Sequence, residues 1–426
     1  MTDIKRKNRL LYIFEAALEY FVTISVSGAY LAYLTTALKI PDALTGVLTS
    51  FVSLGCVFQI LSTFLKGDAK RNTVIFHLIN ELSFVLLYFS PFLPFGDTFK
   101  AIIFTAFLFI GFALNNLINP LKTEWYMQSV DMDKRGVFTA NKEIVSLVFG
   151  MIYSLLLGYI FDLFKAKGDT EGALFTVGII LFTVTAAHSV VMAISERTYG
   201  EILTKDGSDK TKVKNKRQAI KNLLKEKNFI KVVAMIMLWR AVMYSTVPFF
   251  GTYQIKELGF SMTFVSVLAV IYAIVRAVFE RPLGKIADKK GFAVMLNVCY
   301  GAEIAALSAA VFTRPENGKI LYTAYYILHA ICCAGISSGE LNIVYDYVKQ
   351  EERTAALAIK SAVAGISGFL STLILSPVVS AIQKHGFKLF GVNVYAQQVT
   401  SFIGLVSAIA LVVYNVVVIQ KIERRI

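Results

Sequence analysis

Residues 196–228 read ERTYGEILTKDGSDKTKVKNKRQAIKNLLKEKN and form the longest polar run in a chain of 426 residues. On each side of this run lie six predominantly apolar segments, each about the ~20 residues that a helix needs to cross a bilayer. The chain therefore divides into an expected six-helix bundle at 1–195, a basic cytoplasmic linker at 196–228 and a second six-helix bundle at 229–426. The expected spans are 11–37, 43–65, 73–95, 101–121, 137–163, 173–195, 229–254, 261–282, 292–312, 319–347, 354–382 and 396–420.

Basic residues gather in alternate loops. Roughly three quarters of the 43 Lys and Arg residues fall on the side shared by the two termini, and cationic loops stay cytoplasmic. Both termini should therefore be cytoplasmic, and the number of spans should be even. The same loops explain the net charge of +14, so we expect no nucleic-acid partner. With 56% hydrophobic and 17% charged residues, the composition predicts a multi-pass protein of the cell membrane.

The later part of the linker has its apolar residues at helical spacing, with lysines around them. Val213, Ile220, Leu223 and Leu224 are the residues concerned. Two interpretations remain open: an amphipathic helix on the anionic inner leaflet, or a solvated linker.

Cysteines and histidines give no sign of a metal site or of catalysis. All four cysteines (Cys56, Cys299, Cys332 and Cys333) lie in apolar segments, without the Cys/His spacing of a zinc site. We expect them to be packing residues. Three of the four histidines lie inside expected spans, and no Gly-rich phosphate-binding element is present. The sequence therefore predicts no enzyme activity, no cofactor and no metal.

The two halves resemble each other. Between spans four and five lies DMDKRGVFTANK (131–142), and between spans ten and eleven lies KQEERTAALAIK (349–360). Arg135, Ala140 and Lys142 match Arg353, Ala358 and Lys360 at identical spacing, and two further acidic pairs match at nearly the same offset: Asp68 with Asp288 and Glu81 with Glu303. Such a repeat is how many secondary transporters build two rocking halves around a midplane site.

The loop after span eight reads Gly284-Lys-Ile-Ala-Asp288-Lys289-Lys290-Gly291. It resembles the signature G-x-x-x-D-(R/K)-x-G of the major facilitator superfamily, and the twelve spans extend this resemblance over the whole chain. The first-half copy around Asp68 departs from it, with Phe64 in place of the glycine and Ala69 in place of the cation. Other motifs assign the chain to no branch of the family.

The resemblance implies an all-α integral membrane protein of two pseudo-symmetric six-helix bundles. It also implies a cytoplasmic gate, for which the candidate residues are Asp68, Gly284, Asp288, Lys289, Gly291, Arg135 and Arg353.

In the resembled fold, spans one, four, seven and ten line a central cavity. Polar residues at helical spacing gather on those four spans, where they normally face a bundle interior or water. The candidates for substrate binding are Glu19, Thr23, Tyr30, Asn115, Asn119, Arg240, Tyr244 and Glu340, and those for proton coupling are Glu15, Glu19, Glu340 and His329. Glu19 and Arg240 occupy nearly equivalent depths, so they are expected to form either a working charge pair or a permanent structural one. His329 is either a proton relay or a hydrogen-bonded packing residue.

These observations predict a secondary active transporter that moves a small hydrophilic solute by alternating access, coupled to protons or another cation. Two alternatives stay open: an exporter or facilitator of amphipathic, drug-like compounds, and a membrane sensor that binds solute without moving it. The expected partners are membrane lipids, the solute and the coupling ion, and the expected oligomeric state is a monomer.

Overall fold

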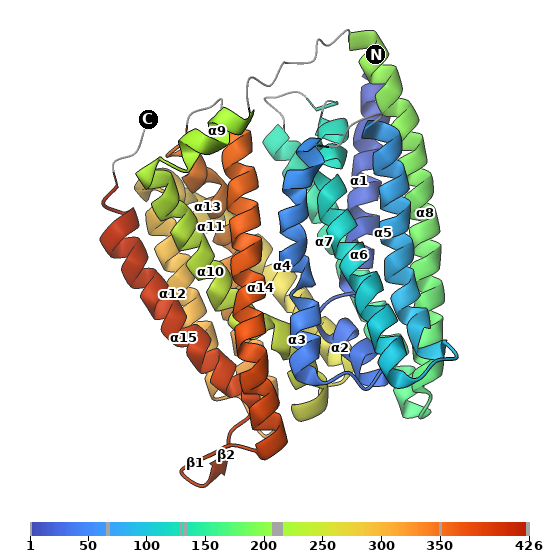
Figure 1. Cartoon of the computed structure of the whole chain (residues 1–426), viewed down its shortest axis with the longest axis vertical. Helices are drawn as coiled ribbons and strands as arrows, with labels where there is room; N and C mark the ends of the chain where they lie inside the picture. Colours follow the sequence, from blue (N-terminus) through green and yellow to red (C-terminus); the bar gives the residue numbers. More distant parts are fainter. Residues whose placement is uncertain are drawn as a thin grey trace. The chain divides into compact units, whose positions relative to one another are not determined.

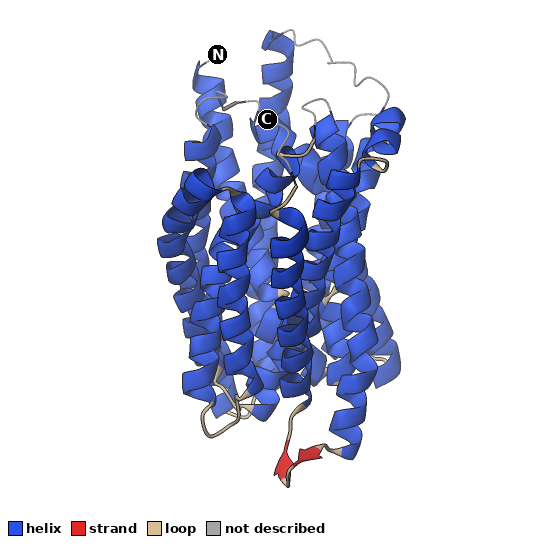
Figure 2. Cartoon of the chain, turned by 90° about the vertical axis from the view of Figure 1, so that its left-hand side faces the viewer, coloured by secondary structure: helices blue, strands red, loops and turns tan. Residues whose placement is uncertain are grey.

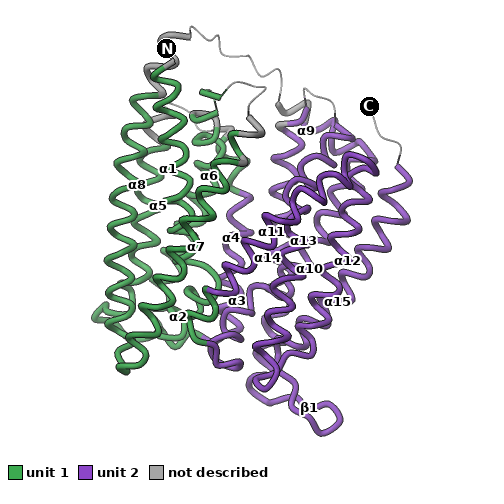
Figure 3. Tube along the Cα trace, turned by 180° about the vertical axis from the view of Figure 1, so that it is seen from behind, with its two compact units in different colours: residues 1–40, 58–212, 261–266 green, residues 41–57, 213–260, 267–426 purple. Residues whose placement is uncertain are grey.

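The computed structural model describes residues 2–64, 69–127, 129–130, 135–206, 216–348 and 352–422. Nearly all of this described chain is helical, as Figures 1 and 2 show, and one short pair of strands is present. The helices fall into two compact units (Figure 3). Unit 1 comprises residues 1–40, 58–212 and 261–266, and unit 2 comprises 41–57, 213–260 and 267–426. Each unit is therefore assembled from segments that are not adjacent in the sequence.

Unit 1 is built mainly on five packed helices, in which α1 contacts α7 and α8 while α5 contacts α6 and α8. Its elements are α1 (Thr2–Ser25), α2 (Gly28–Ala37), most of the 3-10 helix η1 (Cys56–Phe64), α5 (Ala69–Phe89), η2 (Ser90–Phe92), α6 (Asp97–Met127), α7 (Arg135–Ala166) and α8 (Thr170–Asp206).

Unit 2 packs α10 against α14 and α15, and α12 against α13 and α15. Its elements are α3 (Asp42–Thr49), α4 (Phe51–Gly55), α9 (Lys216–Leu223), α10 (Lys227–Thr252), the π-helix η4 (Tyr253–Glu257), most of α11 (Met262–Lys290), α12 (Phe292–Val311), α13 (Gly318–Tyr345), α14 (Arg353–His385), β1 (Lys388–Leu389), β2 (Val392–Asn393), α15 (Ala396–Tyr414) and the π-helix η6 (Asn415–Ile419).

Eleven of the described helical stretches are long and apolar enough to cross a membrane, and the bent pair α1–α2 raises the number to twelve. Large apolar side chains such as Ile152, Ile320 and Ile374 lie 60%, 76% and 70% exposed on these helices. Exposed apolar surface of this extent suits contact with lipid rather than water. The predicted all-α, membrane-spanning fold is therefore confirmed, whereas the cytoplasmic placement of the termini stays a prediction.

The first expected span is not one straight helix. It breaks between Ser25 and Gly28, and the two pieces meet at 44°. Gly28 has a φ of +54°, a left-handed conformation that glycine adopts without the steric penalty of a Cβ. The break turns α2 away from the axis of α1.

A hairpin that we did not anticipate follows α14. Lys388 pairs with Asn393 and Leu389 with Val392 in antiparallel register. The two turn residues, Phe390 and Gly391, both have positive φ, as a tight two-residue hairpin turn requires.

The central polar stretch contains more helix than the sequence suggested. Helix α8 continues to Asp206, and α9 covers Lys216–Leu223 and packs on α14. Leu223, the last residue of α9, is buried, and Leu224, which follows the helix, is 57% exposed.

Candidate functional site

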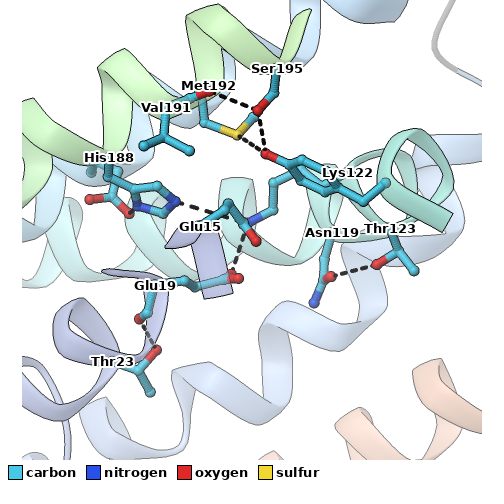
Figure 4. Close-up of polar contacts among 12 residues, drawn as sticks. Glu15, Glu19, Thr23, Asn119, Lys122, Thr123, His188, Val191, Met192 and Ser195 are labelled. Carbon is cyan, nitrogen blue, oxygen red and sulfur yellow. Dashed lines mark hydrogen bonds and ion pairs between the residues drawn. The ribbon is translucent and has the colours of Figure 1, made fainter. Parts of the chain in front are cut away.

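A lysine lies buried among carboxylates in unit 1. The Nζ of Lys122 on α6 lies 2.8 Å from Oε1 of Glu15 and 2.9 Å from Oε1 of Glu19, both on α1 (Figure 4). The exposed fraction of the side chain is 4% for Lys122 and 2% for Glu15, but 26% for Glu19. Glu19 is therefore the carboxylate of this pair that water reaches most readily.

The cluster continues through His188 on α8. Its Nε2 lies 3.7 Å from Oε1 of Glu15, and its Nδ1 lies 3.2 Å from Oε1 of Glu81 on α5. Thr185 donates a hydrogen bond of 3.0 Å to the other oxygen of Glu81. Four helices thus contribute to one chain of buried polar groups, which we call the unit 1 cluster: Glu15, Glu19, Glu81, Lys122 and His188.

Helical spacing brings these side chains together. Glu15 and Glu19 are four residues apart, one turn along α1. Lys122 continues the face of α6 that carries Asn115 and Asn119, because steps of four and three return to the same side of a helix.

Negative charge is in excess in the unit 1 cluster. Its three carboxylates face one lysine, and protonation of His188 would still leave one carboxylate without a balancing cation. Uncompensated charge in a low-dielectric interior is costly. The arrangement therefore favours the uptake of a proton or another cation.

The other candidates in unit 1 have mostly local partners. Tyr30 is buried, donates to the carbonyl of Ser154 at 2.8 Å and lies 2.8 Å from Oγ of Ser266. Thr23 is exposed and donates to the backbone of its own helix, while Asn119 is exposed and accepts a bond of 3.4 Å from Thr123. Asn115 is half-buried on the same helix. Of these residues, Asn119 and Thr23 offer the most accessible polar groups.

A second cluster of charges lies in unit 2. Nη2 of Arg240 on α10 lies 3.1 Å from Oε2 of Glu340 on α13, and Nζ of Lys360 on α14 lies 2.9 Å from the same oxygen. We call Arg240, Glu340 and Lys360 the unit 2 cluster. Glu19 and Arg240 each have a partner within their own unit, Lys122 for Glu19 and Glu340 for Arg240. The expected pairing of Glu19 with Arg240 stays a prediction.

Tyr244 and His329 lie on the helices of the unit 2 cluster but differ in surroundings. Tyr244 is half-buried one turn after Arg240 on α10. His329 is buried, with Nδ1 2.7 Å from Oε2 of Glu303 and its ring stacked on Tyr325. These contacts match the packing interpretation of His329 at least as well as the relay.

The structure describes some of the gate candidates fully and others in part or not at all. Asp68 lies outside the described residues, and for Arg135 the structure describes only its position at the start of α7. Asp288 and Lys289 are exposed on the last turn of α11, and Gly291 begins α12 with a φ of +90°. The guanidinium of Arg353 lies 4.6 Å from the centre of the Tyr345 ring.

Gly284 has open space around it in the described part of the chain. A Cβ placed there would meet no described atom within 4 Å. Its expected place in the gate stays a prediction.

Three buried residues with possible metal ligands meet in the region of the unit 1 cluster. His77, Glu81 and His188 bring ligand atoms within 4.8 Å of one another. Imidazole and carboxylate groups are typical zinc ligands, and this set could not be predicted because α5 and α8 contribute to it from distant positions in the sequence. In the structure, His188 and Thr185 already bind both oxygens of Glu81, so the expectation of no metal stays a prediction.

Two central cations were missed from the sequence. Lys122 fell just outside the expected span 101–121, although its spacing from Asn115 and Asn119 was a usable signal. Lys360 lies inside the expected span 354–382 but was noted only as the match of Lys142, whereas its side chain is only 14% exposed and binds Glu340. For Lys122 the helix extends further than the apolar run.

A family model of the Major Facilitator Superfamily matches residues 13–372 and 255–421. Among curated proteins, no sequence matches.

Solved structures share the fold at low identity. The nucleoside transporter NupG matches with 14% identity and a TM-score of 0.69, over 99% of this chain and 100% of that one. A POT family peptide transporter matches with 12% identity and a TM-score of 0.68, over 98% and 97% of the two chains. A D-xylose-proton symporter matches with 13% identity and a TM-score of 0.64, over 95% and 96%. The expected membership is thereby confirmed: the chain belongs to the major facilitator superfamily and has the fold of its transporters, not that of an enzyme.

Proposed function

We propose that the protein is a proton-coupled secondary active transporter of a small hydrophilic solute, operating by alternating access in the cell membrane. The observation that supports this most is the unit 1 cluster, in which a buried lysine faces more carboxylates than it can neutralise. The solved structures that share the fold of this chain include a nucleoside transporter and a D-xylose-proton symporter. Small polar solutes are thus the class of cargo that we propose here.

Glu19 is the proposed entry point for the proton. Its side chain is 26% exposed, whereas those of Glu15 and Glu81 are 2% and 3% exposed. A proton on Glu19 removes one of the two ion pairs of Lys122 and lowers the excess negative charge. The charge of the cluster then differs between the loaded and unloaded states, which is what a coupled conformational change needs.

The test uses the full chain in liposomes with an inward proton gradient and a panel of sugars, nucleosides, amino acids, short peptides and organic acids. We expect one polar solute class to accumulate inside the liposomes above its outside concentration. A pH-sensitive dye in the lumen should report that the interior becomes more acidic at the same time. In the variant Glu19→Gln, gradient-driven accumulation is lost while downhill exchange of the same solute is retained.

The matched control is Asp97→Asn, which breaks the exposed pair of Asp97 with Lys39 elsewhere in unit 1. That variant should accumulate solute as the wild type does.

Normal uphill accumulation by Glu19→Gln would exclude Glu19 as the proton carrier. Transport of amphipathic compounds alone would favour the exporter, and solute binding without any counterflow would favour the sensor.

A further inference from the structure

The unit 2 cluster brings three charged side chains together from three helices. Arg240, Glu340 and Lys360 come from α10, α13 and α14, and both cations bind the same carboxylate oxygen, Oε2 of Glu340. Two cations and one carboxylate leave an excess of positive charge, opposite in sign to that of the unit 1 cluster. An additional anion would balance this charge.

Two polar atoms of the cluster lack partners. Among the described residues, neither the buried Oε1 of Glu340 nor the buried Nε of Arg240 has a hydrogen-bond partner. Buried polar atoms normally have a hydrogen-bond partner, because leaving one without a partner costs its desolvation. The free Nε leaves one edge of the guanidinium fork available to a further acceptor.

The two cations are more exposed than the carboxylate that they bind. The side chain of Arg240 is 32% exposed and that of Lys360 is 14% exposed, while that of Glu340 is only 3% exposed. A solute that reached this site would therefore meet the two cations before it met Glu340.

The other ionisable groups facing the cluster are ordinarily neutral. Cys56 and Tyr244 lie near Arg240, and Tyr300 of α12 lies near Glu340. No described acidic side chain other than Glu340 forms an ion pair with Arg240 or Lys360. Within the described part of unit 2, no further ion pair balances the positive excess.

We infer that Arg240 and Lys360 bind a carboxylate group of the transported solute, which takes the place of the Glu340 carboxylate. This inference rests on the proposed function and narrows its cargo to carboxylate-bearing solutes. Arg240 and Lys360 already bind the planar carboxylate of Glu340, so the same donors suit a carboxylate of the solute. The fork of an arginine matches two coplanar oxygens better than it matches a point acceptor.

The exchange keeps the charge of the site constant. The solute carboxylate accepts hydrogen bonds from Arg240 and Lys360, and Glu340, released from both cations, takes one proton from water. One negative charge enters and one is neutralised, so no net charge is added to the low-dielectric interior. The solute and one proton therefore enter the site together.

The experiment measures thermal stabilisation of the purified full chain at constant ionic strength with matched pairs of probes. The probes are lactate against lactamide and glucuronate against glucuronamide, with inorganic phosphate as a tetrahedral anion. We expect stabilisation by the carboxylates and not by the amides, and a stronger effect at acid than at neutral pH because Glu340 must take up a proton.

The decisive variant is Glu340→Gln, which removes the competing charge without opening space. Its affinity for the carboxylate probes should rise at least about tenfold, equal to ~1.4 kcal/mol, and should no longer depend on pH. If Glu340 had only a structural role, carboxylate affinity should not rise in this variant. The neutral amide of the glutamine would leave both cations without an ion pair and would still occupy the site. Unchanged or weakened carboxylate binding in Glu340→Gln overturns the inference.

If Glu340→Gln does not fold, the inference is tested with Lys360→Met in a chain that keeps Glu340. It should abolish stabilisation by carboxylates, whereas Lys256→Met, which breaks the pair with Asp42 elsewhere in unit 2, should leave it intact. Equal loss in both variants overturns the inference, as does preference for phosphate. Proton-driven uptake restricted to neutral solutes would overturn it too, while leaving the proposed function standing.

Discussion

Lys122 holds two ion pairs in the interior of unit 1, so its removal leaves Glu19 without its recorded cation and Glu15 with only His188 beside it. Breaking a buried pair by removing one partner typically costs about 3–5 kcal/mol, because a charge remains buried and uncompensated. We expect Lys122→Met to destabilise the protein by about that amount. Chemical unfolding in mixed micelles, followed by tryptophan fluorescence, measures the difference.

The pH dependence of this loss has a definite sign. Protonation removes the uncompensated charge of the two carboxylates, so the deficit of Lys122→Met relative to wild type should shrink as the pH falls. Lys39→Met is the control, because Lys39 and Asp97 are exposed and such pairs contribute little. A deficit that is independent of pH would show that the cost comes from lost packing instead.

Repeated positions in the two halves have taken different roles. Lys142 and Lys360 match in the sequence repeat, yet Nζ of Lys142 lies 4.7 Å from the centre of the Tyr12 ring while Lys360 binds Glu340. The sequence could identify both lysines as equivalent but not their partners. A partner depends on which side chain a neighbouring helix presents, and no local pattern encodes that.

At the scale of elements, helices approach closely where glycine allows it. A Cβ at Gly365 of α14 would lie 2.4 Å from the backbone oxygen of Ser53 on α4, and Oγ of Ser53 donates to the carbonyl of Gly365 at 3.1 Å. Small residues and hydroxyl bonds are typical of close helix pairs in membranes. This contact joins α4 to α14 inside unit 2.

We expect Gly365→Ala to push these helices apart and to lower the apparent melting temperature by several degrees, since a backbone atom cannot move as a side chain can. The comparison is Gly301→Ala on α12, where a Cβ meets no described atom within 4 Å. That variant should melt as the wild type does or slightly higher, because alanine favours the helix. Equal melting of the two variants would contradict the close approach.

The sequence predicted the elements better than their ends. Apolar runs located the spans, since crossing a bilayer requires them, but polar residues that continue a helix beyond the bilayer core carry no such signal. For that reason α6 was expected to end before Lys122, and α8 before Asp206. The bend at Gly28 and the hairpin turn at Phe390 depend on backbone conformation, for which hydropathy is no guide.

At the scale of the whole molecule, the loop charges predict which side each connection faces. The hairpin around Phe390 should be extracellular, and the central polar stretch should be cytoplasmic. Phe390 is 97% exposed, so a cysteine placed there should react readily.

We expect Phe390→Cys to be labelled by a membrane-impermeant thiol reagent in intact cells, and Ser208→Cys to be labelled only after permeabilisation. The four natural cysteines lie in helices, and the parent protein measures their background. The reverse pattern would invert the topology and, with it, the expected placement of the termini.

The division into units also has a consequence for synthesis on the ribosome. Residues 261–266 belong to unit 1, so this unit is not complete when its main block of helices has been translated. Residues 41–57 belong to unit 2, so they are made long before the helices with which they pack. Unit 1 must wait for the start of α11, and the α3–α4 segment must wait for α10 and α14. The nascent chain is therefore expected to hold its early helices open in the membrane until most of the polypeptide has been made.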